Sequence, residues 1–189
     1  MVVGFQLPEN KKFIGKNLVE CCEMTGMEPW PFVRKMLIDE KLYPDIIGFA
    51  MHEDNVRLFL SHPLGMPASD GSVYSPEGPL GETMPHPRSY GSFTRFFGKY
   101  VREDKICDLS TAVHKATALP ASRLHLKDRG LLVPNYAADI VVFNPETIID
   151  LSSFVEPHKF NAGIEQVFVN GVWTIRDGKH TGELAGQLI

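Results

Sequence analysis

The residues that could do chemistry lie in two short polar stretches, "ASDGS" around Asp70 and "HPRSYG", which begins at His86. The first holds a single carboxylate beside a glycine, and the second brings His86, Arg88 and Tyr90 close together. A carboxylate can carry a proton in hydrolysis, and a guanidinium is the side chain best matched to a substrate carboxylate. The local sequence around Asp70, taken alone, favours an ordinary Asp-Gly turn.

The histidines predict no metal centre of their own. The chain has 7 of them, and none shows the HxH or HExxH spacing that places two nitrogens on one ion. His86 lies between prolines and is expected to be structural, because one ligand makes no metal site. One alternative stays open, namely a small α/β enzyme that builds a metal site from Asp70, His62 and His86.

Composition and charge exclude several classes of function. The chain has 189 residues, 19 basic against 23 acidic, with no basic cluster, so no nucleic-acid partner is predicted. No apolar run is long enough to span a membrane and no secretory leader is apparent, so we expect a cytoplasmic protein. Cys21 and Cys22 fit a helix as small apolar filler, and no disulfide framework is predicted.

Two helices are predicted near the start of the chain. Asn17 and Glu20 have the spacing of a capping box, which begins a short helix that Gly26 ends. Residues 28–40 predict a second helix, with its prolines near the first turn. The opening "MVVGF" has the pattern of a strand that has nothing before it to pair with.

The elements around Asp70 predict a strand, a helix and a second strand. The candidates are an apolar strand at 44–51, an amphipathic helix at 52–62 and a weaker strand at 63–70. This order predicts a βαβ unit with parallel pairing and with Asp70 at the end of its last strand. The Pro- and Gly-rich residues 72–90 predict a long loop, and long loops in compact domains often carry function.

The second half of the chain changes from helices to strands. Residues 92–103 and 109–124 predict two helices, the second interrupted or kinked at Pro120. Residues 138–145 form a β-branched run. Two later extended runs meet at Asn170-Gly171, the pair that a two-residue type I′ hairpin favours.

Four stretches carry a resemblance to a known family. They are "HPRSYGSFTRFFGKYVRE", "LSTAVHKATALPASRLHLKDRG", "YAADIVVFNPETI" and "GIEQVFVNGVWTIRDGKHTG". Together they resemble the C-terminal part of an N-acyl-D-amino-acid deacylase (D-aminoacylase), a branch of the amidohydrolase superfamily. The closing β segment is similar to the superfamily in general, while "SDG" followed by "HPRSYG" points to this branch. The resemblance covers nearly the whole chain but less than half of the family's usual length.

The resemblance implies an α/β fold, the C-terminal part of a (β/α)₈ barrel followed by a small β segment of a β-sandwich. Residues 1–130 would be the barrel portion, with 1–45 an inserted helical segment and 46–130 the last barrel strands and helices. Residues 131–189 would be the β segment. Two strands cannot close a barrel, so another copy, a partner chain or a rearranged packing must complete the sheet.

The resemblance also implies roles for the polar residues. Asp70 would lie beside a zinc centre, as a secondary ligand at most, and would carry a proton from the metal-activated water to the leaving amine. Arg88 would bind the α-carboxylate of an N-acyl-D-amino acid, with Tyr90 and Ser89 lining the same mouth. The family draws its primary metal ligands from residues upstream of anything in this sequence. We therefore expect the chain alone to bind no zinc tightly and to have negligible deacylase activity.

Two interpretations follow from this. The chain is a fragment or split product whose partner supplies the N-terminal half, or it is a non-catalytic remnant that serves as a binding or oligomerisation module. Both predict association, either with another copy or with a second chain, because a missing half-barrel leaves strand edges and apolar surface uncovered.

Overall fold

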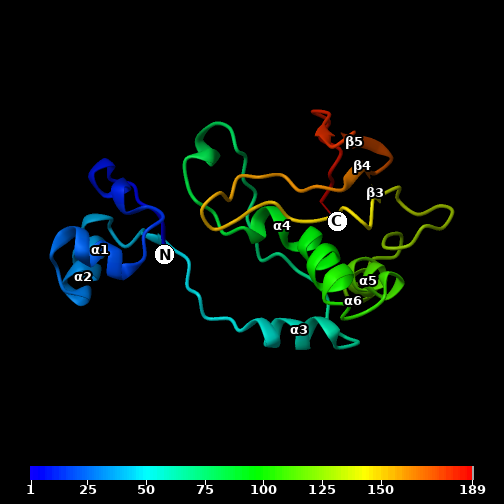
Figure 1. Cartoon of the computed structure of the whole chain (residues 1–189). Coiled ribbons are helices and arrows are strands. Elements are labelled where there is room, and N and C mark those ends of the chain that lie inside the picture. The colour runs from blue at the N-terminus through cyan, green and yellow to red at the C-terminus, as the bar shows by residue number, and fades with distance from the viewer. Residues whose placement is uncertain (189) are drawn as a thin grey trace. The chain divides into compact units, whose positions relative to one another are not determined.

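A computed structural model describes residues 1–188 (Figure 1). The chain divides into two compact units, each built from separate stretches of sequence and each described here by itself. Unit 1 consists of Met1–Ala50, Gly71–Ser89 and Ser152–Lys159. Unit 2 consists of Met51–Asp70, Tyr90–Leu151 and Phe160–Ile189.

Unit 1 is a small helical unit with one short pair of strands. Its elements are β1 (Val2–Gly4), the 3₁₀-helix η1 (Pro8–Phe13), α1 (Leu18–Thr25), α2 (Pro29–Asp39), β2 (Asp45–Ile46) and the 3₁₀-helix η2 (Pro79–Gly81). Phe13, Cys21, Phe32 and Met36 form its buried core. Cys21 is fully buried there, so its predicted use as apolar filler is confirmed, and burial raises the pKa of its thiol.

The first two predicted helices are confirmed. The Asn17 side chain accepts a hydrogen bond from the Glu20 backbone N–H at 3.0 Å, and the Glu20 carboxylate accepts one from the Asn17 N–H at 2.7 Å. This reciprocal pair satisfies two of the N–H groups that the start of α1 leaves without partners in the helix. The helix ends at Gly26, whose φ of +66° suits a residue without a Cβ.

One charged side chain lies inside unit 1. Glu40 follows α2 and is only 2% exposed, and its carboxylate accepts hydrogen bonds from the Gln6 N–H at 2.7 Å and the Asn10 amide at 2.6 Å. Burial alone would raise the pKa of this carboxyl. The hydrogen bonds from Asn10, Gln6 and Leu7 outweigh burial and lower the pKa, so Glu40 stays ionised and holds the residues after β1 against α2.

Unit 2 begins with a set of helices around a second core. They are α3 (Glu53–Ser61), α4 (Arg88–Arg95), which unit 2 contains from Tyr90 onward, the π-helix η3 (Phe96–Glu103), α5 (Leu109–Ala116) and α6 (Ala118–Arg123). Phe96, Tyr100 and Ala112 are buried, and Val56 and Leu60 of α3 pack against them. The predicted helix at 92–103 is thus confirmed, with its second part wound as a π-helix.

The predicted interruption of the helix at 109–124 is confirmed, but it lies three residues before Pro120. The break between α5 and α6 is at Thr117, whose backbone leaves the helical region at φ −132° and ψ −85°. Pro120 lies in the first turn of α6, where the backbone N–H that proline lacks has no partner in the helix.

Unit 2 ends in a four-stranded antiparallel sheet of β3 (Ile140–Phe143), β4 (Ile164–Val169), β5 (Val172–Arg176) and β6 (Lys179–His180), in that order. The predicted hairpin is confirmed, because β4 and β5 pair across Asn170 and Gly171, whose φ angles are +49° and +79°. Positive φ at both positions is the requirement of a type I′ turn.

The predicted parallel βαβ unit is wrong. The helix of that prediction is present as α3, but β2 pairs antiparallel with β1, and residues 63–70 form no strand. Two prolines and a glycine interrupt that segment, and the carbonyls at its start bond to a side chain instead of a neighbouring strand. The "MVVGF" strand therefore has a partner after all, later in the chain.

The structure leaves the finer fold assignment a prediction. Both sheets described for residues 1–188 are antiparallel, so the parallel barrel implied by the resemblance is not among these elements. The assignment of 1–130 to a barrel portion and 131–189 to a sandwich stays a prediction.

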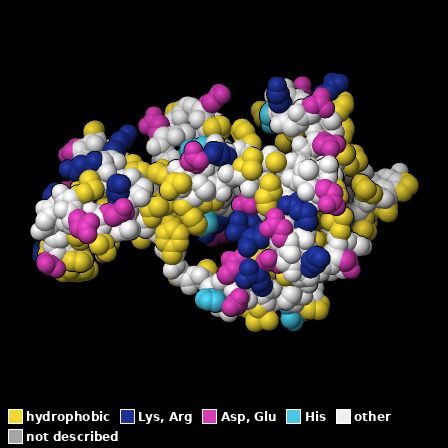
Figure 2. Space-filling view, in the orientation of Figure 1, with side chains coloured by type: hydrophobic (Ala, Val, Ile, Leu, Met, Phe, Trp, Pro, Cys, Tyr) yellow, Lys and Arg dark blue, Asp and Glu magenta, His cyan; other side chains and the backbone are white. Residues whose placement is uncertain are grey.

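The surface carries no patch of one charge on the face shown in Figure 2, where acidic and basic side chains are interspersed with hydrophobic ones. Among residues 1–188, no helix is both long enough and apolar enough to cross a bilayer.

Candidate functional site

Asp70 lies in an irregular segment and is exposed to solvent. Its φ is +45°, in the left-handed region that aspartate tolerates better than most residues. The next residue, Gly71, passes so close to the first turn of α4 that a Cβ there would lie 2.8 Å from the Ser89 Cα. The Ser72 N–H also donates to the Ser89 hydroxyl at 3.4 Å. The chain that leaves Asp70 is therefore anchored on the residue that follows Arg88.

Arg88 is the first residue of α4 and its side chain is exposed. His86 stabilises the start of this helix, because its Nδ1 accepts a hydrogen bond from the Arg88 backbone N–H at 3.0 Å. The His86 ring also meets Phe154 edge-on, with ring centroids 5.0 Å apart. Burial, helped by the charge of Arg88, lowers the pKa of His86, which keeps Nδ1 free to accept. His86 thus has the structural role that the sequence indicated.

Tyr90 lies two residues after Arg88 in α4 and is half-buried in unit 2. Its ring meets that of Phe160 at a centroid distance of 5.9 Å. Its carbonyl accepts a hydrogen bond from the Asn161 amide at 2.7 Å. Asp70 and Tyr90 belong to unit 2, whereas Arg88 belongs to unit 1. The roles predicted for the three residues stay predictions.

The residues that the structure describes do not make a metal site by themselves. Within 1–188, no three His, Cys, Asp or Glu side chains come together in a way that could hold an ion. His62 ends α3, where its Nδ1 accepts a hydrogen bond from the Leu64 N–H at 3.2 Å. Asp70 and His62 belong to unit 2 and His86 to unit 1, so the alternative of a metal centre built from these three residues stays a prediction.

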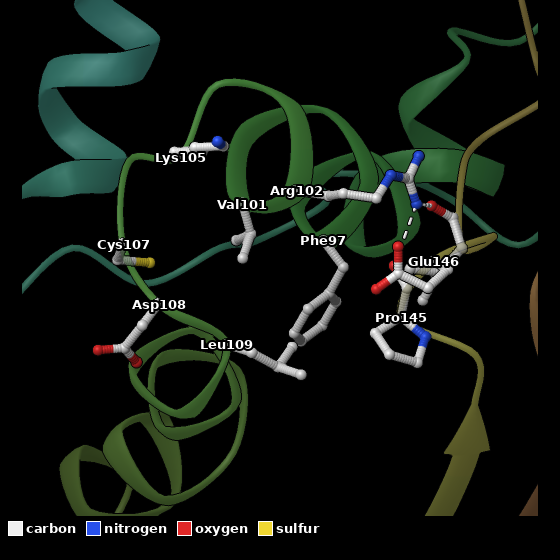
Figure 3. A pocket seen from close by; sticks show the side chains of 10 residues that line it. Phe97, Val101, Arg102, Lys105, Cys107, Asp108, Leu109, Pro145 and Glu146 are labelled. Atoms are coloured by element: carbon white, nitrogen blue, oxygen red, sulfur yellow. Dashed lines mark hydrogen bonds between the residues drawn. The ribbon is translucent and has the colours of Figure 1, made fainter.

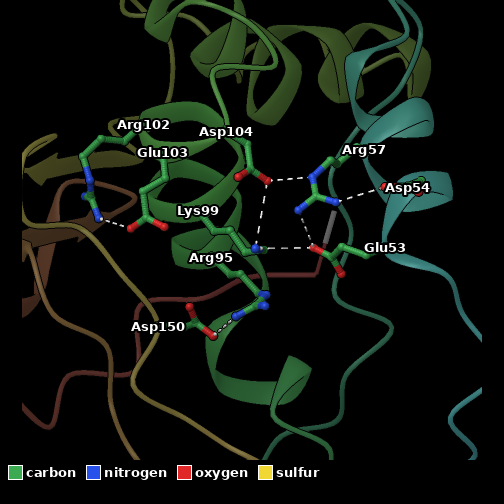
Figure 4. Close-up of polar contacts among 9 residues, drawn as sticks. All are labelled: Glu53, Asp54, Arg57, Arg95, Lys99, Arg102, Glu103, Asp104 and Asp150. Carbon is green, nitrogen blue, oxygen red and sulfur yellow. Dashed lines mark hydrogen bonds and ion pairs between the residues drawn. The ribbon is translucent and has the colours of Figure 1, made fainter.

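A cluster of ion pairs joins the start of α3 to the π-helix η3 (Figure 4). Arg57 donates to the Asp104 carboxylate at 2.9 Å and lies 3.8 Å from that of Glu53, while Lys99 lies 3.7 Å from Glu53. The hydrogen bond to Asp104 raises the pKa of Arg57. These ion pairs link α3 to η3, and none of the residues in the cluster was predicted to take part in chemistry.

No sequence pattern singled out Lys115 of α5. It is 2% exposed, whereas most lysines reach solvent, and its ammonium group donates to backbone carbonyls at the end of α3. The available signal was its spacing from Ala112, three residues away on the buried face of the same helix.

Two cavities lie within unit 2, and neither is lined by Asp70, Arg88 or Tyr90. The first has a volume of about 440 Å³ and is bordered by η3 and the start of α5 (Figure 3). Its Arg102 already donates to the Ile148 carbonyl at 2.6 Å, and burial raises the pKa of the Cys107 thiol, which makes it a poor nucleophile.

The second cavity, of about 570 Å³, lies among α4, η3, α5, β3 and β4. Its lining is mostly aliphatic and aromatic, including Phe93, Val113, Phe143 and Ile164. Its polar lining includes Ser110, His114 and Thr117, and none of these residues was predicted to take part in chemistry.

Comparisons with known proteins agree with one another. The model of the amidohydrolase family matches residues 26–175. An N-acyl-D-aspartate deacylase of Alcaligenes xylosoxydans xylosoxydans is 40% identical over 146 residues, which are 76% of this chain and 27% of that protein. The chain spans between 27% and 34% of the length of the curated relatives it matches.

Solved structures give the same result. An N-acyl-D-glutamate deacylase from Bordetella bronchiseptica, complexed with zinc and a phosphonate mimic of the tetrahedral intermediate, matches with a TM-score of 0.79 and 34% identity, over 94% of this chain and 36% of that one. A D-aminoacylase, studied for its binuclear metal center, matches with a TM-score of 0.83 and 33% identity, over 98% of this chain and 36% of that one.

The resemblance to N-acyl-D-amino-acid deacylases that the sequence indicated is thereby confirmed. The family model matches well over half of the residues, and it includes Asp70, Arg88 and Tyr90. The chain belongs to the amidohydrolase family.

Proposed function

We propose that the chain forms the C-terminal part of a hydrolase that cleaves N-acyl-D-amino acids into a carboxylate and a free D-amino acid. One observation carries the assignment of roles. Gly71 and Ser89, the residues that follow Asp70 and Arg88, are packed so closely that no side chain fits between them. A proton carrier and a carboxylate anchor must be held in register with each other, and this packing joins their two segments.

In the proposed reaction, Asp70 accepts a proton from the attacking water and delivers it to the leaving nitrogen. An exposed carboxylate is accessible to both the water and the leaving nitrogen, and the segment after Asp70 is restrained by the packing of Gly71 on Ser89. The solved relative is complexed with zinc, and a zinc ion can polarise a carbonyl and activate water as a Lewis acid. The residues at 1–188 do not complete a site for it, so its ligands would come from outside them.

Arg88 binds the α-carboxylate of the substrate in this proposal. Its guanidinium can form two parallel hydrogen bonds to a carboxylate. It also stands in the first turn of α4, where the helix dipole adds positive potential that favours an anion. Tyr90, in the same turn, would line the mouth of the site.

A second candidate function is that of a non-catalytic module that binds another copy or a different chain. Many large apolar side chains of unit 1 are exposed, among them Trp30 at 73%, Leu42 at 75% and Tyr43 at 68%. Surfaces of this kind favour association. The same surfaces would serve a partner that completes an enzyme, so association alone does not separate the two candidates.

The deciding experiment measures hydrolysis of N-acetyl-D-aspartate and N-acetyl-D-glutamate with added zinc. The chain is assayed alone and mixed with the N-terminal two-thirds of a relative expressed separately, roughly the share that the comparisons leave uncovered. We expect turnover only in the mixture, reduced at least ~100-fold by Asp70→Asn. Arg88→Lys should raise KM more than it lowers kcat.

Asp128→Asn, an exposed aspartate away from these segments, is the matched control and should leave turnover unchanged. Turnover by the chain alone, abolished by Asp70→Asn, would show that it builds a complete metal centre and would overturn the proposal of a partial enzyme. If the mixture turns over substrate equally well with Asp70→Asn, Asp70 does not carry the proton. A stable complex without turnover would favour the binding module.

A further inference from the structure

Lys115 makes its contacts with one short stretch of backbone. Its ammonium group donates to the carbonyl oxygens of Leu60 at 2.7 Å and Gly65 at 3.1 Å, and also to that of His62. An ammonium group has three donors, and here each has an acceptor, which is the condition for burying it. The acceptors are the last carbonyls of α3 and of the turn after it, groups that a helix leaves without internal partners.

The turn that these carbonyls form leaves no room for a side chain. Gly65 donates to the His62 carbonyl at 2.8 Å, and a Cβ at Gly65 would lie 2.0 Å from the Phe59 carbonyl oxygen. The chain therefore turns directly against the last turn of α3. Lys115 lies where the helix end and the turn meet, and it binds both.

The helix that carries this turn is itself fixed in unit 2. Near its start, Arg57 is bonded to Asp104 at 2.9 Å. On its inner face, Val56 and Leu60 pack against the core around Phe96. A shift of the turn relative to the rest of unit 2 therefore requires the bonds of Lys115 to break.

We infer that Lys115 is a positioning residue for Asp70. Asp70 stands five residues after Gly65, in an irregular segment that includes Pro67, so the direction in which this segment leaves the turn sets where Asp70 lies. Removing the ammonium group leaves three backbone carbonyls without their donor and frees the turn. The catalytic meaning of this rests on the proposed function, whereas the restraint on the segment does not.

The test measures backbone mobility in the absence of substrate, so it remains decisive even if the proposed activity fails. NMR ¹⁵N relaxation gives order parameters for residues 64–70 in the wild type, Lys115→Met and Lys127→Met. Lys127 is the matched control, because it is a lysine of the same unit whose side chain is exposed. We expect rigid values of about 0.85 in the wild type and in the control, and values below about 0.6 in Lys115→Met.

The order parameters of α5 are recorded in the same spectra and should stay rigid in all three proteins. A segment 64–70 that remains rigid in Lys115→Met would overturn the inference. So would a loss of order spread evenly over unit 2, because Lys115 would then be a general stabiliser.

A further variant, Gly65→Ala, covers the case in which Lys115→Met does not fold. The added methyl group collides with the Phe59 carbonyl and forces the turn away from Lys115 while the lysine itself stays. We expect the same local loosening of 64–70. A rigid segment in Gly65→Ala would count against the inference as directly as one in Lys115→Met.

Discussion

Units 1 and 2 each bury a charged side chain, and they satisfy it in opposite ways. Glu40 of unit 1 accepts hydrogen bonds from backbone N–H groups and an amide, whereas Lys115 of unit 2 donates to backbone carbonyls. Each is 2% exposed. In both units the buried charge binds a stretch of chain at the end of a regular element, after β1 in unit 1 and at the end of α3 in unit 2. The difference is that only the acceptor in unit 1 can be neutralised by acid.

The largest expected effect is that of Glu40→Gln. The amide has nearly the shape of the carboxylate, but its NH₂ group would face the donors of Asn10 and Gln6, and buried donors would lose their acceptor. We expect unit 1 to lose about 2–3 kcal/mol of its free energy of unfolding. Native-state hydrogen exchange of the α1 and α2 amides, measured against urea, gives this value.

Glu23→Gln is the control for that substitution, because Glu23 lies exposed on α1. It should change the same free energy by less than about 0.5 kcal/mol. Equal losses in the two variants, or a loss shared by the β4 and β5 amides, would break the comparison between the units.

A lower pH should weaken the contacts of Glu40 in unit 1 but not those of Lys115 in unit 2, and this effect should be smaller than that of Glu40→Gln. The folded pKa of Glu40 is lowered from its ordinary 4.5, so the unfolded chain binds its proton first as the pH falls. The contribution of Glu40 is therefore complete above about pH 4.5 and is lost as the pH falls through the lower folded pKa. The carbonyl acceptors of Lys115 do not titrate. Protection factors of the Gln6 and Gly65 amides between pH 6 and 3 should fall at Gln6 first.

The smallest expected effect concerns how two helices begin. α4 is capped by the neutral imidazole of His86, and α5 by the carboxylate of Asp108, which accepts from the Thr111 N–H at 2.7 Å. That hydrogen bond lowers the pKa of Asp108 below its ordinary 3.8, while burial lowers the pKa of His86 below 6.5. Each cap is complete above the ordinary pKa and is lost as the pH falls through the folded one.

As the pH falls from 7, therefore, we expect the start of α4 to loosen before that of α5. Amide shifts of Arg88 and Thr111 recorded along a pH titration report the two caps separately. His86→Leu should behave at every pH as the wild type does in acid, and His86→Asn, which keeps an acceptor that does not titrate, should hold the helix start throughout. A pH response that survives in His86→Asn would refute this explanation.

The sequence predicted the features that depend on near neighbours. Asn17 with Glu20, and Asn170 with Gly171, each specify a geometry within four residues, and both predictions are confirmed. The errors depend on distant contacts. Nothing near β2 indicates that its partner is β1, and nothing near 63–70 indicates that a lysine of α5 would take its carbonyls.

The candidate site divides in the same way. Asp70 and Arg88 were singled out from residue type and family resemblance, and their roles stay predictions. The packing of Gly71 on Ser89 and the restraint by Lys115 join residues far apart in the chain, so no local pattern could predict them.

The division of unit 1 into three stretches also has a consequence for how the protein is made. Its last stretch, Ser152–Lys159, places Phe154 against Phe49 and His86, and His158 lies 2.7 Å from the Thr83 carbonyl. The helices of unit 1 are therefore synthesised before unit 2, and the last stretch of unit 1 only after most of unit 2. A chain cut short before Ser152 would present the helices of unit 1 without the segment that packs on Phe49 and His86.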